Sequence, residues 1–294
     1  MFPSRRPPGH RRRAPRIAAG LTILALVATA CSGTSSSGSN GDTPAQGPTT
    51  TTVALLPLEQ PASRCGTATT KATLVRFQAA DGTSLNGVLV GRGPAGVVLA
   101  HQYPSDLCGF WPFADYLAKR GLRAFAIDLR CFGRSACPEG EAKGRVVDDL
   151  AAAVAELRRR GVTRVALVGA SMGGAAVLIA GTRVQPPVAA VVSLSGEPDP
   201  TSLVGGIPLN AGAVVGQLRV PTMFVVATND SSVSVQETRA MYQAVQNGDK
   251  RLEVLSGDLD GLHGWGLLRN PATGGQGGPV ATKVTAFLTA HTRG

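Results

Sequence analysis

The chain has 294 residues, of which 43% are apolar, so it can bury a full core, and this composition excludes a disordered or fibrous protein. Its net charge of +10 and pI near 10 would suggest a nucleic-acid partner if the charges were evenly spread. However, residues 1–30 hold six arginines and no acid, and the remainder has 23 basic and 19 acidic residues without a basic stripe. We therefore expect no nucleic-acid partner.

The first thirty residues have the pattern of an export signal. Arginines precede an apolar run over residues 17–30, which is too short to cross a bilayer as a helix but has the length of a signal-peptide core. The run ends in Ala28-Thr29-Ala30-Cys31, which resembles the lipobox of bacterial lipoproteins. On that resemblance Cys31 is acylated and anchors the protein to the outer face of the bacterial cell membrane. Cleavage after Ala30 with secretion is the alternative.

A linker and then a domain follow this signal. Residues 31–65 are rich in serine, glycine, threonine and proline, so burial cannot offset the entropy of ordering them, and we expect a flexible tether. The domain is expected over residues 66–294. Four cysteines, an even number, suit two disulfides in an oxidising compartment, and four reduced buried thiols are the alternative. The sequence leaves the pairing open among Cys65, Cys108, Cys131 and Cys137.

From residue 71 onward, short β-rich runs alternate with longer helical runs. This order predicts a three-layer α/β domain, with helices on both faces of a mostly parallel sheet. An antiparallel hairpin across Asp81-Gly82 opens the sheet, and little or no cap is expected between residues 195 and 220. The expected strands cover residues 72–80, 84–90, 96–100, 122–129, 164–169, 188–194, 221–227 and 250–255. The expected helices cover residues 110–120, 146–160, 172–181, 235–246 and 279–291.

The segment Gly169-Ala170-Ser171-Met172-Gly173 matches the G-x-S-x-G nucleophile elbow, a tight turn that presents a serine between a strand and a helix. A buried strand precedes the serine and an apolar helix follows it, as the motif requires. Glycines flank the serine because a side chain there would clash with the neighbouring strand and helix. The helix start also directs N–H groups and partial positive charge at Ser171. The alternative is a glycine-lined helix start with a capping serine.

A serine hydroxyl is a weak nucleophile, so a histidine must accept its proton and a carboxylate must orient that histidine. Two of the four histidines, His101 and His263, follow expected strands. The chain order serine, acid, histidine selects His263, which follows the last strand. His101 is the second candidate for the proton carrier.

Asp230 is the preferred acid. It follows the strand 221–227 closely, so its carboxylate reaches the edge of the sheet at which open parallel sheets bind ligands. Other carboxylates also lie near this edge in the expected fold. The competing residues are Glu197, Asp199, Asp258 and Asp260.

These motifs resemble the α/β-hydrolase superfamily, in its esterase and dienelactone-hydrolase-like branch, from about Leu74 to the end of the chain. The segment Leu99-Ala100-His101-Gln102-Tyr103 resembles the family's His-Gly-x segment after the third strand, with Gln102 in place of glycine. The segment from Asp128 to Ser135 is similar to the family's D-x-R-G-x-G-x-S loop, with Cys131 in place of a glycine.

The resemblance implies acyl transfer from a small-molecule ester, with lactones and thioesters as further candidates. Ser171 is the implied nucleophile, His263 the base and Asp230 its partner, and the backbone N–H groups of Tyr103 and Met172 form the oxyanion hole. No metal or cofactor is implied, and the oligomeric state stays open. The resemblance also implies that Cys108 bonds Cys131 or Cys137. The alternative function is an inactive surface lipoprotein that binds ligands through a hydrolase fold.

Overall fold

The computed structural model describes residues 64–66, 71–275 and 277–293. The predicted signal segment 1–30, the acylation residue Cys31 and the expected linker as far as residue 63 lie outside these residues. Among the helices that the structure describes, none combines the length and the apolar character needed to cross a membrane.

Eight strands form one sheet in the order β1-β2-β4-β3-β5-β6-β7-β8. Strand β2 pairs antiparallel with both β1 and β4, and the other neighbouring strands pair in parallel. The prediction of an opening hairpin followed by a mostly parallel sheet is confirmed. The strands are β1 Ala72–Gln78, β2 Ser84–Val90, β3 Ala95–Ala100, β4 Arg123–Asp128, β5 Arg164–Ala170, β6 Val191–Leu194, β7 Thr222–Ala227 and β8 Lys250–Leu255.

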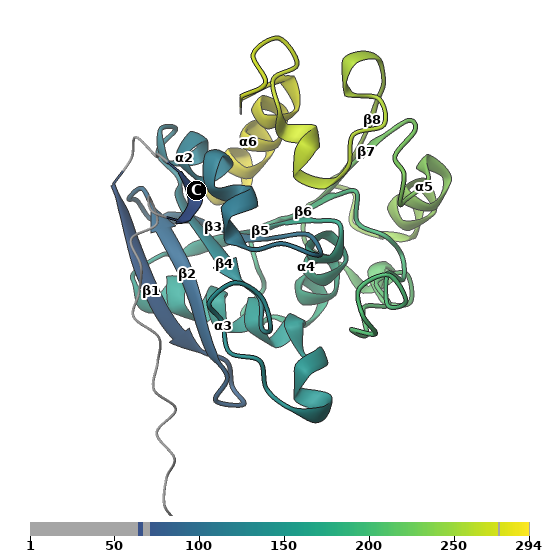
Figure 1. Ribbon diagram of the computed structural model, residues 1–294. Helices are drawn as coiled ribbons and strands as arrows, with labels where there is room; N and C mark the ends of the chain where they lie inside the picture. Colours follow the sequence, from purple (N-terminus) through teal and green to yellow (C-terminus); the bar gives the residue numbers. More distant parts are fainter. Residues whose placement is uncertain (1–63, 67–70, 276, 294) are drawn as a thin grey trace, which may run out of the picture. The chain divides into compact units, whose positions relative to one another are not determined.

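Helices cover both faces of the sheet (Figure 1). Strand β3 shows how the sequence builds both layers, because Val98 joins one apolar cluster while Val97 and Leu99 join the other. Helices α3 Val146–Arg159, α4 Met172–Arg183 and α5 Val235–Ala244 pack on the first face, and α2 Trp111–Ala118 and α6 Pro279–Thr292 pack on the second.

The helix expected over residues 110–120 is shorter than predicted. The 3₁₀ turn η1 Leu107–Phe110 precedes it, and α2 begins at Trp111 with a proline in its first turn. Gly121 has φ of 81°, so it ends the helix in the left-handed conformation that the sequence indicated.

The parallel strands gather chemically active residues at one edge of the sheet. His101 follows β3, Ser171 follows β5, Ser195 follows β6, Asp230 follows β7 closely, and His263 comes after β8. Because these strands are consecutive in the sheet and run in the same direction, their carboxyl ends place these loops beside one another. Between β6 and β7 the described chain holds only turns and the 3₁₀ turn η3 Val215–Gln217, so it builds no helical cap there.

Candidate active site

Ser171 lies in the tight turn that joins β5 to α4. Its backbone has φ of 49° and ψ of −117°, a conformation that non-glycine residues rarely adopt. A Cβ at Gly169 would collide with the backbone of Gly173, and one at Gly173 would collide with the backbone of Ala100 and His101. The two glycines therefore let the strand, the helix and the neighbouring loop approach closely enough to hold the serine in this turn.

His263 and Asp230 form a hydrogen-bonded pair. Nδ1 of His263 lies 2.8 Å from Oδ1 and 3.0 Å from Oδ2 of Asp230. The Asp230 side chain is fully buried, whereas that of His263 is 20% exposed. Because an ionised carboxylate only accepts, Nδ1–H is the donor, and Nε2 is left as the free base. This is the arrangement in which an imidazole can take a proton from a hydroxyl.

Several donors hold Asp230 in its ionised form. Backbone N–H groups of Ser232 and Val233 donate to Oδ1 at 2.9 and 3.2 Å. Burial alone would raise the pKa of this carboxyl, but hydrogen bonds from His263, Ser195 and Ser232, together with the charge of His263, lower it below its ordinary value. The acid is therefore a carboxylate at neutral pH.

The loop that carries His263 lies against the elbow that carries Ser171. A Cβ built at Gly264 would sit 3.4 Å from the Cβ of Ala170, the residue just before the serine, and would collide with the side chain of Gln102. Gly264 itself has φ of 58°, so this position needs a glycine both for space and for backbone conformation. Within the described residues, no hydrogen bond joins the Ser171 hydroxyl to His263. The structure thus pairs the acid with the histidine and places the serine in the adjacent loop.

Ser195 is a site residue that the sequence reasoning missed. Its hydroxyl accepts the backbone N–H of Gly264 at 3.0 Å and lies near enough to Asp230 to help lower the pKa of that carboxyl. The residue is 1% exposed, and its φ is 50°. One hydroxyl therefore links the acid to the loop that carries the base. The available signal was its place directly after β6, between the strands that supply the nucleophile and the acid.

The other carboxylates that the sequence offered as the acid make no hydrogen bond to His263 in the described chain. Asp260 accepts hydrogen bonds from the backbone and side chain of Asn229, at 2.9 and 2.8 Å, and so holds the end of β7. Asp199 is exposed and accepts from Thr201, and Asp258 is exposed. Glu197 is buried, and it does not contact the imidazole through a hydrogen bond in the described chain. Asp230 is the acid that contacts His263.

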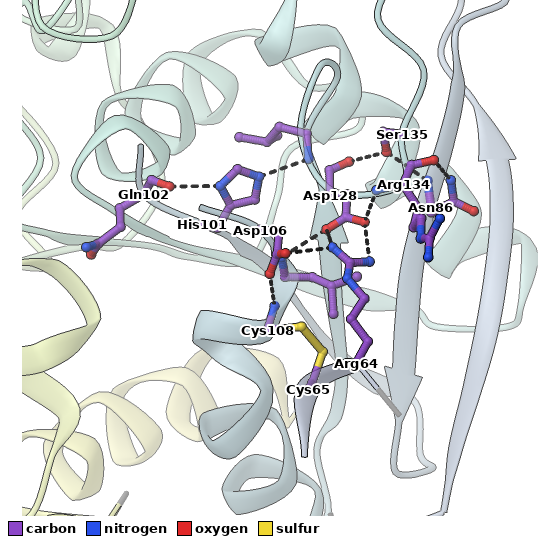
Figure 2. A network of polar contacts seen from close by, with 12 residues as sticks. Arg64, Cys65, Asn86, His101, Gln102, Asp106, Cys108, Asp128, Arg134 and Ser135 are labelled. Carbon is purple, nitrogen blue, oxygen red and sulfur yellow. Dashed lines mark hydrogen bonds and ion pairs between the residues drawn. A yellow bond between two sulfur atoms is a disulfide. The ribbon is translucent and has the colours of Figure 1, made fainter. Parts of the chain in front are cut away.

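His101 is fully buried and positions its own loop. Nδ1 pairs with the carbonyl of Gln102 at 2.9 Å, and Nε2 accepts the N–H of Leu129 at 3.2 Å, so the imidazole is neutral with its proton on Nδ1 (Figure 2). Burial lowers the pKa of His101, which also favours this neutral form. With both nitrogens occupied, His101 does not serve as the proton carrier. It fixes the segment that carries the Tyr103 N–H.

The two predicted oxyanion donors lie on the loops that flank Ser171. Met172 is the first residue of α4, where a helix leaves its N–H groups without intrahelical partners. Tyr103 follows the buried His101, and its side chain is 39% exposed. In the part of the chain that the structure describes, neither N–H takes part in a backbone hydrogen bond between loops. Both remain candidates to bind a developing oxyanion.

Asp128, at the end of β4, joins four segments of the chain (Figure 2). Its Oδ1 accepts the N–H of Leu107 at 2.9 Å, and its Oδ2 accepts the N–H of Arg134 at 2.8 Å. Arg64 donates to both carboxylate oxygens, at 2.9 and 3.1 Å, and also pairs with Asp106 at 2.8 Å. This network fixes the loops behind His101 and ties Arg64 to them.

The disulfides correct one expectation. Cys108 bonds Cys65, and Cys131 bonds Cys137, so the expected bond from Cys108 to Cys131 or Cys137 is wrong. The reason for the second pair is local: Cys131 has φ of 67°, and its N–H donates to Ala136, which closes a short loop. The ion pairs of Arg64 bring the adjacent Cys65 to Cys108 instead (Figure 2).

Comparison with known proteins agrees with this architecture. The Pyrococcus furiosus esterase Pf2001 is similar to this chain, with a TM-score of 0.63 at 19% identity, over 80% of this chain and 97% of that one. The chain has the α/β-hydrolase fold. The predicted fold is thus confirmed, and its elbow and histidine loop occupy the carboxyl edge of the sheet.

Solved structures of an enol-lactonase and a lipase are also similar to this chain in fold. An enol-lactonase from Burkholderia xenovorans LB400 has a TM-score of 0.55 at 17% identity, over 72% of this chain and 99% of that one. The Paleococcus ferrophilus monoacylglycerol lipase has a TM-score of 0.55 at 14% identity, over 75% of this chain and 99% of that one.

Residues 93–203 match the family described as serine aminopeptidase, S33. No curated protein matches the chain. Among the described residues, no cluster of three or more His, Cys, Asp or Glu could hold a metal ion.

Proposed function

We propose that this α/β-hydrolase-fold chain is a serine hydrolase that cleaves carboxylic esters through an acyl-enzyme intermediate. The observation that carries the proposal is the His263–Asp230 hydrogen bond of 2.8 Å beside the strained turn of Ser171. A buried carboxylate that orients a histidine next to a serine on a strand-to-helix turn is the arrangement that activates a hydroxyl for attack.

The reaction follows from the role of each group. His263 Nε2 accepts the proton of the Ser171 hydroxyl as Oγ attacks the ester carbonyl, and Asp230 stabilises the imidazolium that forms. The N–H groups of Met172 and Tyr103 stabilise the tetrahedral oxyanion, each by about 3 kcal/mol. His263 then protonates the leaving alcohol. Water, activated by the same histidine, releases the acid and restores the serine.

The surroundings of the site support an ester with an apolar acyl group. Tyr103, on the loop that follows the buried His101, carries a large ring and is 39% exposed. Phe132 packs edge-on against Tyr103, with ring centroids 5.8 Å apart. Because the described chain has no helical cap between β6 and β7, we infer that the site is open to substrates from solvent. Lactones and thioesters, which share the acyl carbonyl, are further candidates for the same chemistry.

The test is hydrolysis of p-nitrophenyl acetate by the wild type and by Ser171→Ala. Without the nucleophile, kcat/KM should fall by at least about 10⁴-fold while the far-ultraviolet circular dichroism spectrum is unchanged. A fluorophosphonate probe should label the wild type and leave Ser171→Ala unlabelled. The matched control is Ser256→Ala, which alters an exposed serine outside the site and should react like the wild type.

Two results would contradict the proposal. One is a Ser171→Ala protein that still hydrolyses the ester at the wild-type rate. The other is a folded wild type that turns over no ester and takes up no probe, which would favour a ligand-binding role for the same fold.

A further inference from the structure

Glu197 is a buried carboxyl that the mechanism above does not use. It lies three residues after the end of β6, is 5% exposed, and its Oε2 has no hydrogen-bond partner in the described part of the chain. Leaving a polar group buried without a partner costs free energy, so such a group in a native structure needs an explanation. Its position beside the candidate dyad supplies one.

Charged groups on three other segments influence the pKa of the Glu197 carboxyl. The charge of His263 in the loop after β8 favours its ionised form, while Asp230 after β7 and Glu237 on α5 oppose it. Of these, Glu237 already caps its helix by accepting hydrogen bonds from Ser234. Burial is the largest influence and raises the pKa of Glu197 to about 7. The carboxyl therefore changes charge in the pH range in which the dyad would work.

Close packing of the backbone at Gly196 fixes the segment that carries Glu197. Gly196, the preceding residue, lies so close to β6 and α4 that a Cβ there would collide with the Ser193 hydroxyl and approach the carbonyl carbon of Gly174 to 2.8 Å. Ser195, one residue earlier, accepts the backbone N–H of Gly264, the residue next to His263. The segment that carries Glu197 is thus packed against the elbow helix and hydrogen-bonded to the loop of His263, and the Glu197 side chain is buried there.

We propose that Glu197 is a positioning residue for the hydrolytic reaction, a second carboxylate whose negative charge stabilises the His263 imidazolium formed when Ser171 gives up its proton. The inference rests on the proposed function, because it needs His263 to be protonated during the reaction. It assigns Glu197 no proton transfer and no contact with substrate. Asp230 orients the imidazole through a hydrogen bond, whereas Glu197 acts through its charge.

The proposal gives the effect of Glu197 a definite pH dependence. Well below pH 7 the carboxyl is neutral, so replacing it with an amide removes no charge. Above pH 7 it is ionised, and the amide removes a charge that favours the imidazolium. The ratio of wild-type to Glu197→Gln kcat/KM should therefore rise from near one at about pH 5.5 to about threefold to tenfold at about pH 8.5. A purely structural defect would lower activity by the same factor at every pH.

The decisive experiment measures kcat/KM for p-nitrophenyl acetate against pH in the wild type, Glu197→Gln, Glu197→Asp and Asp199→Asn. Glu197→Asp keeps the charge and should restore the rise of activity above pH 7. Asp199→Asn makes the same carboxylate-to-amide change two residues away, on an exposed side chain, and should follow the wild type. A ratio that stays constant with pH would overturn the proposal. If Glu197→Gln does not fold, Glu197→Met removes the charge without adding a buried polar group.

A second measurement keeps this inference separate from the proposed function. Carbon-13 nuclear magnetic resonance follows the Glu197 side-chain carboxyl against pH in the resting protein, with Glu197→Gln identifying its signal. Its transition should lie near pH 7, because burial raises the pKa of this carboxyl to about 7. A transition at the ordinary glutamate value would contradict the role of Glu197, whereas activity retained by Ser171→Ala would contradict the serine mechanism alone.

Discussion

Ser195 shows how much of the proposed hydrolytic site can depend on one hydroxyl to which the proposed mechanism assigns no chemistry. It accepts the N–H of Gly264, the residue next to His263, and helps to lower the pKa of the Asp230 carboxyl. A displacement of the imidazole by about 1 Å can lower a rate by about 10²-fold, so a group that holds both partners matters for turnover. At the scale of single residues, the two loops of the dyad are joined through this side chain as well as through the dyad itself.

Replacing Ser195 with alanine should lower kcat for p-nitrophenyl acetate by about tenfold with little change in KM, because the dyad loses a support and the binding surface does not. It should also lower the free energy of unfolding by about 1–3 kcal/mol, since the Gly264 N–H is left without its buried partner. Steady-state kinetics and urea unfolding measure the two effects. Ser193→Ala is the control: this buried serine on β6 bonds the carbonyl of Gly174 instead. Equal kcat values in the two variants would contradict the assigned role.

The sequence could select candidate site residues where a motif constrains the backbone. The glycines around Ser171 and the position of His263 after the last strand made both residues candidates before any coordinates, and the structure places them in adjacent loops. Ser195 gave no comparable signal, because an isolated serine after a strand is common. The role of Glu197 depends on burial and on charges from three other segments, which no local pattern in the sequence contains.

Among the secondary-structure elements, α3 is fastened to the loop after β4 by a buried ion pair. The Arg130 and Asp149 side chains are both fully buried, with Nη2 2.6 Å from Oδ1. Asp149 also accepts the backbone N–H and the Nε of Arg130, each at 2.8 Å. The remaining Arg130 nitrogen, Nη1, donates to Asp81 in the β1–β2 turn at 2.7 Å. One arginine therefore connects a helix, a loop and a hairpin.

Substituting Asp149 with asparagine should lower the free energy of unfolding by about 3–5 kcal/mol, because it leaves a buried guanidinium without its main counter-charge. Urea unfolding measured at neutral pH tests this. The neighbouring Asp148→Asn makes the same chemical change in the first turn of α3, on a half-buried side chain, and should cost no more than about 1 kcal/mol. Similar losses in the two variants would show that the Arg130 pair contributes little.

At the scale of the whole molecule, the succession of strands and helices along the chain was predictable and the disulfide pairing was not. Alternating apolar periods predicted the sheet and its helices, because burial on both faces imposes a pattern on the sequence. The cysteine pairing depended on where Arg64 and Cys65 lie, and these residues follow a segment with no apolar period. Their charge contacts with Asp106 and Asp128 decide the pairing. Two disulfides also suit the oxidising compartment that the export signal predicts.

The two disulfides should differ in their effect on stability. Cys65–Cys108 spans 43 positions and Cys131–Cys137 spans 6, so loop-closure entropy gives the longer bond about 4 kcal/mol and the shorter about 2 kcal/mol. The double variant Cys65→Ser/Cys108→Ser should therefore unfold at lower urea concentration than Cys131→Ser/Cys137→Ser. A larger loss from the short loop would contradict this ordering. The longer bond also holds η1, where Phe110 packs against Trp265, two residues after His263.

The charge network around Asp128 limits how far the α/β-hydrolase-fold domain can be trimmed for expression. A recombinant version beginning at residue 67 would keep β1 to β8 and α2 to α6, yet its Asp128 would lose the two guanidinium hydrogen bonds from Arg64 and Cys108 would become a free thiol. Such a protein would be prone to intermolecular crosslinking during purification. Shortened versions intended for crystallisation should therefore start upstream of Arg64.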